Sequence, residues 1–160
     1  MNNQRKKNLL VITLSPPLPA SSGAPIYITN TLLPLADKYN LHLFTIGGEA
    51  EVRHIEKHKT EYNRYFKSVH IEPRATMPSQ KGTAGRIIHV LEHCYHGLPF
   101  MDASYYSKAA VKNASRIIRE QKIDAMEIHS AHLAFFKKFF PNIPALLVGC
   151  LLYTSDAADE

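Results

Sequence analysis

Five short apolar runs rich in β-forming residues alternate along this chain with longer segments that have helical periodicity. The runs cover residues 9–14, 40–46, 67–72, 124–128 and 144–148, and the helical segments cover residues 25–38, 49–65, 83–96, 104–121 and 131–139. A parallel pair of strands needs a long crossover connection, which is usually a helix. The alternation therefore predicts an α/β fold with a doubly wound, Rossmann-like parallel sheet.

The composition agrees with one globular domain. Hydrophobic residues make up 45% of the chain and charged residues 21%, which excludes global disorder. Two cysteines can form at most one disulfide bond, which excludes a small disulfide-stabilised scaffold. No apolar stretch reaches the roughly 18–20 residues that a membrane-spanning helix needs.

The last eleven residues, CLLYTSDAADE, resemble the translation of a sequencing-library adapter. We therefore expect a truncated reading frame, with a natural domain at residues 1–149 and a non-native tail at residues 150–160. Without the tail, the sequence has 19 basic and 11 acidic residues, which gives a net charge of +8. This balance suits anionic partners, and the single remaining cysteine, Cys94, fits a cytoplasmic location.

Ligands of doubly wound sheets bind beyond the carboxyl ends of the strands. Ser21, Ser22 and Gly23 follow the first strand at the start of a helix, where free backbone N–H groups favour anions. We interpret them as a phosphate-facing loop, with an ordinary turn as the alternative. Neither G-x-G-x-x-G nor G-x-x-x-x-G-K-[ST] occurs, which argues against a dehydrogenase or P-loop protein.

Further polar residues stand at the end of the fourth strand. His129 can act there as a base or hydrogen-bond donor near neutral pH, or it can simply cap the next helix. Histidines also recur at helical spacing at His54 and His58 and at His89, His93 and His96. No H-E-x-x-H pattern accompanies them, so a solvated helix face is the better interpretation than zinc binding.

The helix over residues 83–96 is expected to turn its apolar side inward. Its inward residues would be Ile87, Val90, Leu91 and Cys94, with Cys94 as a packing residue and not a nucleophile. A second apolar cluster, the phenylalanines of residues 135–140, flanks two lysines. That pattern permits contact with an anionic membrane surface, although core packing of two of the rings is the preferred interpretation.

Four stretches of the chain together resemble GT-B glycosyltransferases of the family 4 type. They are residues 9–30 (strand, Pro-Pro, Ser-Ser-Gly, helix), residues 35–45 (Leu-Ala before a strand), residues 117–129 (helix, Asp, strand, His) and residues 141–148 (Pro-Asn-Ile-Pro and a strand). The resemblance spans residues 8–149. It departs from the family at Gly23-Ala24, where members carry a second glycine.

The resemblance implies the N-terminal, acceptor-side half of a retaining enzyme that moves a sugar to a hydroxyl acceptor in polysaccharide or glycolipid synthesis. It implies His129 as a catalytic residue, Ser21, Ser22 and Gly23 near the donor phosphates or acceptor, and Ser130 and Gly47 in the acceptor-side cleft. The implied partners are a nucleotide-sugar donor, a glycan or lipid-linked acceptor and the inner face of the membrane, with no nucleic acid, metal or cofactor. The fragment alone would be inactive, because most of the donor site lies in the missing domain.

Two alternatives remain open from the sequence. A nucleotide-sugar epimerase of GT-B architecture would share the predicted fold. A non-catalytic Rossmann-like binding module would share it as well, and would need no second domain.

Overall fold

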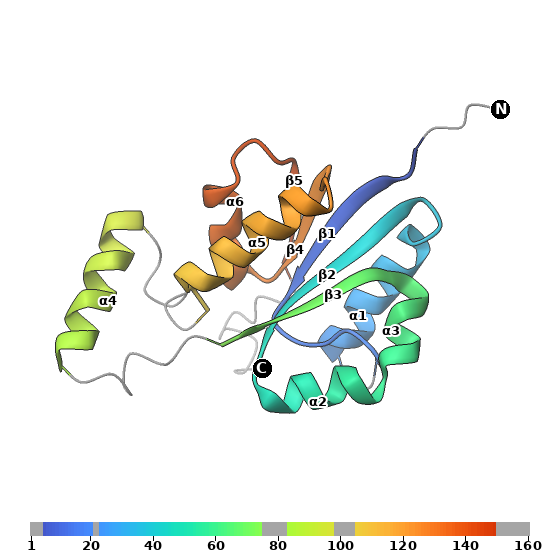
Figure 1. Cartoon of the computed structure of the whole chain (residues 1–160), viewed down its shortest axis with the longest axis horizontal. Coiled ribbons are helices and arrows are strands. Elements are labelled where there is room, and N and C mark those ends of the chain that lie inside the picture. Colours follow the sequence, from blue (N-terminus) through green and yellow to red (C-terminus); the bar gives the residue numbers. More distant parts are fainter. Residues whose placement is uncertain (1–4, 21–22, 75–82, 98–104, 150–160) are drawn as a thin grey trace, which may run out of the picture.

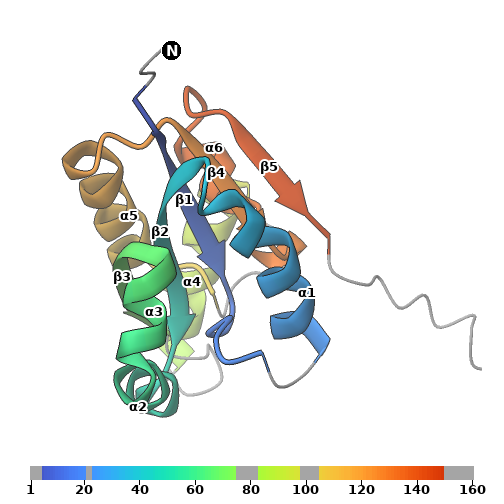
Figure 2. The same ribbon diagram turned by 90° about the vertical axis from the view of Figure 1, so that its right-hand side faces the viewer.

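A computed structural model describes residues 5–20, 23–74, 83–97 and 105–149 of the chain. Five parallel strands form a single sheet in the order β3-β2-β1-β4-β5, as Figures 1 and 2 show. The strands are β1 (Lys7–Thr13), β2 (Tyr39–Gly47), β3 (Phe66–Pro73), β4 (Ala125–His129) and β5 (Ala145–Val148). The order and direction confirm the predicted doubly wound, Rossmann-like α/β fold.

The central strand is β1, which pairs with β2 on one side and β4 on the other. Its residues from Leu9 to Thr13 are all buried, because helices cover the sheet on both faces. A continuous apolar run, not an alternating one, is the pattern that such a strand requires.

The helices divide between the two faces according to the direction of the crossovers. They are α1 (Gly23–Leu32), the 3-10 turn η1 (Leu33–Leu35), α2 (Glu49–Lys57), α3 (Lys59–Tyr65), α4 (Thr83–His96), α5 (Lys108–Glu120), the 3-10 turn η4 (Ala131–Leu133) and α6 (Phe135–Phe139). The helices α1, α2 and α3 share one buried cluster with Leu9 and Val11 of β1. On the opposite face, α5 and α6 pack against Leu10 and Ile12.

Two predicted helices are each divided in two. Pro34 stands where α1 gives way to η1, as expected from a ring that removes a backbone donor and clashes with the preceding turn. The predicted helix over residues 49–65 is interrupted at His58, which separates α2 from α3. In α6, Phe135 and Phe136 are buried, which confirms the preferred interpretation of core packing for two rings of that segment.

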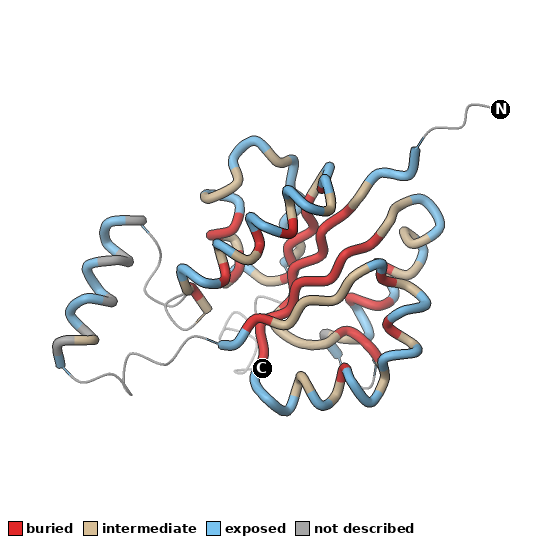
Figure 3. The backbone as a smooth tube through the Cα atoms, viewed as in Figure 1, coloured by how far each residue is buried: buried red, intermediate tan, exposed pale blue. Residues whose placement is uncertain are grey.

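The expectation for α4 was wrong. The helix forms where the periodicity placed it, yet it stands apart from the sheet in Figure 1 and has no buried residue marked in Figure 3. Ile87, Val90 and Leu91 are 56%, 40% and 62% exposed, and Cys94 is an exposed thiol. Periodicity defines an apolar side but does not say what that side contacts.

Among the helices of the described residues, none has the length and apolarity to cross a membrane.

Candidate functional site

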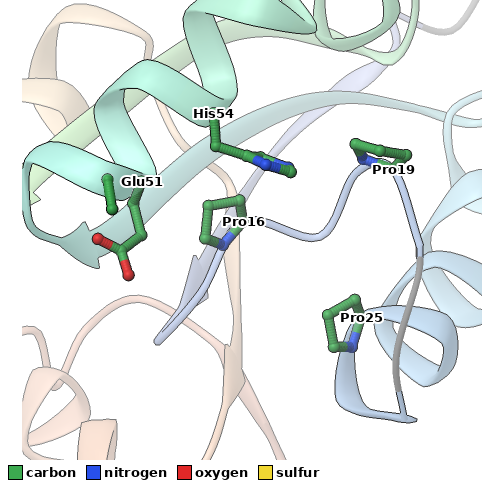
Figure 4. Close-up of a pocket in the computed structure, with 6 residues that line it drawn as sticks. Pro16, Pro19, Pro25, Glu51 and His54 are labelled. Carbon is green, nitrogen blue, oxygen red and sulfur yellow. The ribbon is translucent and has the colours of Figure 1, made fainter.

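An open pocket lies at the carboxyl ends of β1 and β2 (Figure 4). Its volume is about 250 Å³, just below the ~300–1,000 Å³ that is usual for ligand sites. Three prolines and one histidine form much of its wall. The lining residues are Pro16 and Pro19 from the β1–α1 loop, Pro25 from the first turn of α1, and Ala50, Glu51 and His54 from α2.

The proline-rich wall is held by side chains that reach it from α2 and α3. Nε2 of His54 lies 2.8 Å from the Leu18 carbonyl oxygen. Because a carbonyl only accepts hydrogen bonds, Nε2 carries a proton and donates the hydrogen bond to Leu18. The hydroxyl of Tyr62 also donates to the Leu18 oxygen at 2.6 Å, and the Leu18 N–H donates back to it at 3.0 Å. The loop is therefore fixed without help from a ligand.

Glu51 is fixed at the other wall by the start of its own helix. The Gly48 N–H donates to its carboxylate at 2.8 Å. That hydrogen bond is the largest cause that lowers the pKa of Glu51, and the nearby Arg74 and His54 act in the same direction. A Cβ atom at Gly47 would meet Cβ of Glu51 at 2.7 Å. Gly47 therefore lets α2 turn back closely against the end of β2.

The N-terminus of α1 faces the same edge of the sheet. Its first turn has no acidic residue, and a Cβ atom at Gly23 would find nothing within 4 Å. The partial positive charge of a helix N-terminus is therefore not neutralised by an acidic side chain of that turn. Ser21 and Ser22, the other predicted loop residues, lie outside the described residues.

His129 ends β4 at this edge, but its side chain is buried inside the fold. It is 3% exposed, and its Nε2 lies 2.9 Å from Oε1 of Glu127. The two groups are close but are not oriented to form a hydrogen bond. Neither ring nitrogen of His129 has a hydrogen-bond partner within the described residues. Both side chains come from alternate positions of one strand, so they share one face of the sheet. His129 is not among the residues that line the pocket.

Ser130 carries backbone strain directly after His129. Its φ is 115°, a conformation that costs a non-glycine residue of order 1–3 kcal/mol. Three hydrogen bonds hold it: its N–H donates to Val148 at 3.1 Å, its hydroxyl accepts from His132 at 3.2 Å, and its carbonyl accepts from Leu133 at 3.1 Å. The strain directs the chain from β4 into η4.

The parallel topology brings the described members of the predicted site, namely Gly23, Gly47, His129 and Ser130, to the same edge of the sheet. It does not bring them into one pocket. Gly47 has a packing role, and His129 is enclosed.

The residues that the sequence interpretation missed are the prolines, Glu51 and His54. The prolines looked like a simple chain break, and His54 like part of a solvated helix face. A signal was present, because Glu51 stands three residues after Gly48 at the start of a helix.

Within the described residues, no group of three or more histidine, cysteine or acidic side chains could hold a metal ion. The side chains of His89, His93 and His96 lie outside that description.

Neither a family model nor a curated protein matches the chain. Solved structures do match over most of its length. The C-terminal domain of a hydrogenase from Pyrococcus furiosus is 12% identical, with 90% of this chain and 92% of that chain covered and a TM-score of 0.46. A protein of the universal stress protein family from Burkholderia pseudomallei is 9% identical, with 92% and 99% covered and a TM-score of 0.48.

These matches correct the identification as a GT-B glycosyltransferase. Neither of these two structures is a glycosyltransferase, so the predicted sugar transfer and the role in polysaccharide synthesis are withdrawn. The catalytic assignment of His129 stays a prediction. The resemblance misled because strand, loop and helix in this order are common to doubly wound domains with unrelated functions.

Proposed function

We propose that this chain is a non-catalytic Rossmann-like domain that binds a phosphate-bearing small molecule of the nucleotide class. The observation that carries the proposal is the position of the pocket, between the carboxyl ends of β1 and β2 and the N-terminus of α1. Open parallel sheets bind ligands at this edge. The predicted nucleotide-sugar partner belongs to the same chemical class.

Each wall of the pocket matches one part of such a ligand. Pro25 of α1, which lines the pocket, has no N–H, but the N–H groups of the same first turn, next to Gly23, lie beside it and suit a phosphate. The ionised Glu51 carboxylate follows the second strand, where an acidic side chain accepts hydrogen bonds from ribose hydroxyls in this fold. The prolines and the His54 ring offer flat surfaces for a base or sugar. A volume of about 250 Å³ suits one nucleotide unit better than a dinucleotide.

The same walls support a binding role over a catalytic one. The described residues that line the pocket include no serine, cysteine or lysine nucleophile. The imidazole of His54 already donates to Leu18, and the carboxylate of Glu51 accepts from Gly48. General acid–base chemistry needs a group that is free to exchange a proton with the substrate. The cytoplasmic location expected from the single natural cysteine remains part of the proposal.

The test is calorimetric titration of the 160-residue chain with a nucleoside, its monophosphate, a nucleotide-sugar and inorganic phosphate. We expect the monophosphate or the nucleotide-sugar to bind, and to raise the Tm by roughly 5–10 °C at a hundredfold excess over Kd. The nucleoside should bind more weakly, because it lacks the group that faces α1. The nucleotides should be recovered unchanged after incubation.

Gly23→Ala is the sharpest variant. There is open space for the added methyl group, so the free protein should keep its Tm, whereas a phosphate against the helix N-terminus should lose about tenfold or more in affinity. Gly149→Ala is the matched control, because a Cβ atom there also meets nothing within 4 Å. Equal affinity in the two variants, or no binding of any phosphate compound, would refute the proposal.

A further inference from the structure

The helix α4 presents the largest group of exposed apolar side chains in the part of the chain that the structure describes. Five of them are exposed, namely Ile87 (56%), Ile88 (58%), Val90 (40%), Leu91 (62%) and Tyr95 (86%). Contiguous exposed apolar surface of this kind marks a site of interaction with a partner or a membrane.

The apolar residues occupy one side of the helix. At 3.6 residues per turn, the positions from Val90 round to Ile88 span an arc of roughly 160°. Apart from Thr83 at the first position, every residue in that arc is apolar. Arg86, Glu92 and the three histidines occupy the remaining arc. This strong separation is typical of a helix that lies in a membrane interface.

The charges next to α4 favour an anionic surface. Residues 74–97 include three basic residues, Arg74, Lys81 and Arg86, and one acidic residue, Glu92. At the other end of the helix, Nζ of Lys138 donates to the Gly97 carbonyl at 3.3 Å, which places a further cation beside the last turn. Basic residues close to an anionic bilayer are attracted to its negative surface potential.

A second copy of the chain fits the same helix less well. The apolar arc is wider than the narrow seam of a coiled coil, and 14 residues make only two heptads, fewer than the three or four that indicate a coiled coil. The apolar groove over β4 and β5 is the other surface that α4 of a second copy could cover. That groove contains the buried carboxylate of Glu127, and the apolar arc of α4 has no cation to pair with it.

We propose that α4 is an interfacial helix, which places its apolar side in the headgroup region of an anionic membrane and holds the domain at that surface. The proposal does not depend on a ligand in the pocket. It assigns the membrane contact to α4 and not to the phenylalanines of α6, two of which are buried.

The test is the binding of the 160-residue chain to lipid vesicles by co-sedimentation. Binding should be strong to vesicles in which about a third of the lipid is phosphatidylserine and weak to pure phosphatidylcholine. The chain has no tryptophan, so Tyr95→Trp adds a single reporter. Its emission should shift to the blue on binding, because the ring at position 95 enters the interface.

Leu91→Glu should lower the vesicle partition coefficient about tenfold or more, and Leu146→Glu should leave it unchanged. The two leucines are matched in exposure at 62% and 61%, but Leu146 lies on β5. Thermal unfolding of both variants checks that each remains folded. Equal losses in the two variants, or equal binding to both kinds of vesicle, would overturn the proposal. If the chain associates with itself without lipid, and Leu91→Glu abolishes that association, the proposal is overturned in favour of a second copy of the chain as the partner of α4.

Discussion

At the scale of single residues, Tyr62 shows how a side chain can fix a loop that has no regular structure. Tyr62 is 1% exposed, and its hydroxyl makes hydrogen bonds with both the N–H and the carbonyl of Leu18. Burial is the main cause that raises the pKa of Tyr62 to about 12. The hydroxyl therefore satisfies two backbone groups that the sheet cannot reach, and it keeps the pocket wall in place.

We predict that Tyr62→Phe lowers the free energy of unfolding by about 1–3 kcal/mol, because the buried Leu18 N–H loses its partner and the Leu18 carbonyl keeps only the hydrogen bond from His54. Urea unfolding measures this loss, and Tyr27→Phe, at a side chain that is 45% exposed, is the control.

The same residue predicts an alkaline effect. Its pKa is about 12 in the folded chain, against an ordinary value of 10, so the unfolded state releases the proton first. This contribution to stability is complete below pH 10 and is lost as the pH rises towards 12. Tyr62→Phe should lack that part of the pH dependence. An alkaline profile identical to that of the wild type would contradict the assignment.

At the scale of elements, the start of α2 explains why Glu51 belongs to the site. Gly48 is the residue before the helix and has no side chain to cap it, so the Glu51 carboxylate accepts the Gly48 N–H instead. This is the carboxylate half of a capping box, and the charge also suits the positive end of the helix. One side chain thus starts the helix and lines the pocket.

We predict that Glu51→Gln, which keeps an acceptor but removes the charge, lowers stability at pH 7 by about 0.3–1 kcal/mol. Because the pKa of Glu51 is lowered in the folded state, the contribution of its charge is present above its ordinary pKa and is lost as the pH falls through the folded value. The two proteins should therefore converge in acid. Glu49→Gln is the control from the same turn: its side chain is 91% exposed and pairs with Arg53 at 3.2 Å, so the change removes a charge but no hydrogen bond to Gly48. A difference that persists in acid would contradict this cause.

At the scale of the whole molecule, the sequence predicted the fold class, a doubly wound parallel sheet, but not the order of the strands in it. Apolar runs such as residues 9–14 indicated strands, and their alternation with helical segments indicated a doubly wound parallel sheet. The position of α4 could not be predicted, because its pattern fits a core helix and an interfacial helix equally well. The candidate pocket lies at the edge of the sheet where the sequence placed a site, but its lining depends on the tertiary contacts of His54 and Tyr62 with Leu18, which no local pattern encodes.

The predicted boundary between the domain and the tail, at residue 149, can be tested on the whole chain. The predicted non-native tail at residues 150–160 implies that a chain ending at Gly149 keeps the Tm of the 160-residue chain. A chain that ends before Pro144 should unfold at a lower temperature, because β4 loses its ladder with β5. Thermal unfolding followed by circular dichroism measures both. A clear loss of Tm on removal of the tail alone would contradict the boundary.

The pairing of β1 with β4 has a consequence for how the molecule folds. Leu9 lies opposite Ala125, so the central ladder closes only after most of the polypeptide has been made and brought back across the sheet. Contacts so distant in sequence slow folding. The connection from β3 to β4, which includes α4, lengthens the loop that must close before β1 and β4 pair. The entropy cost of closing a loop grows only slowly with its length. Changes of length in that connection should therefore alter the folding rate little, which leaves this part of the chain free to vary.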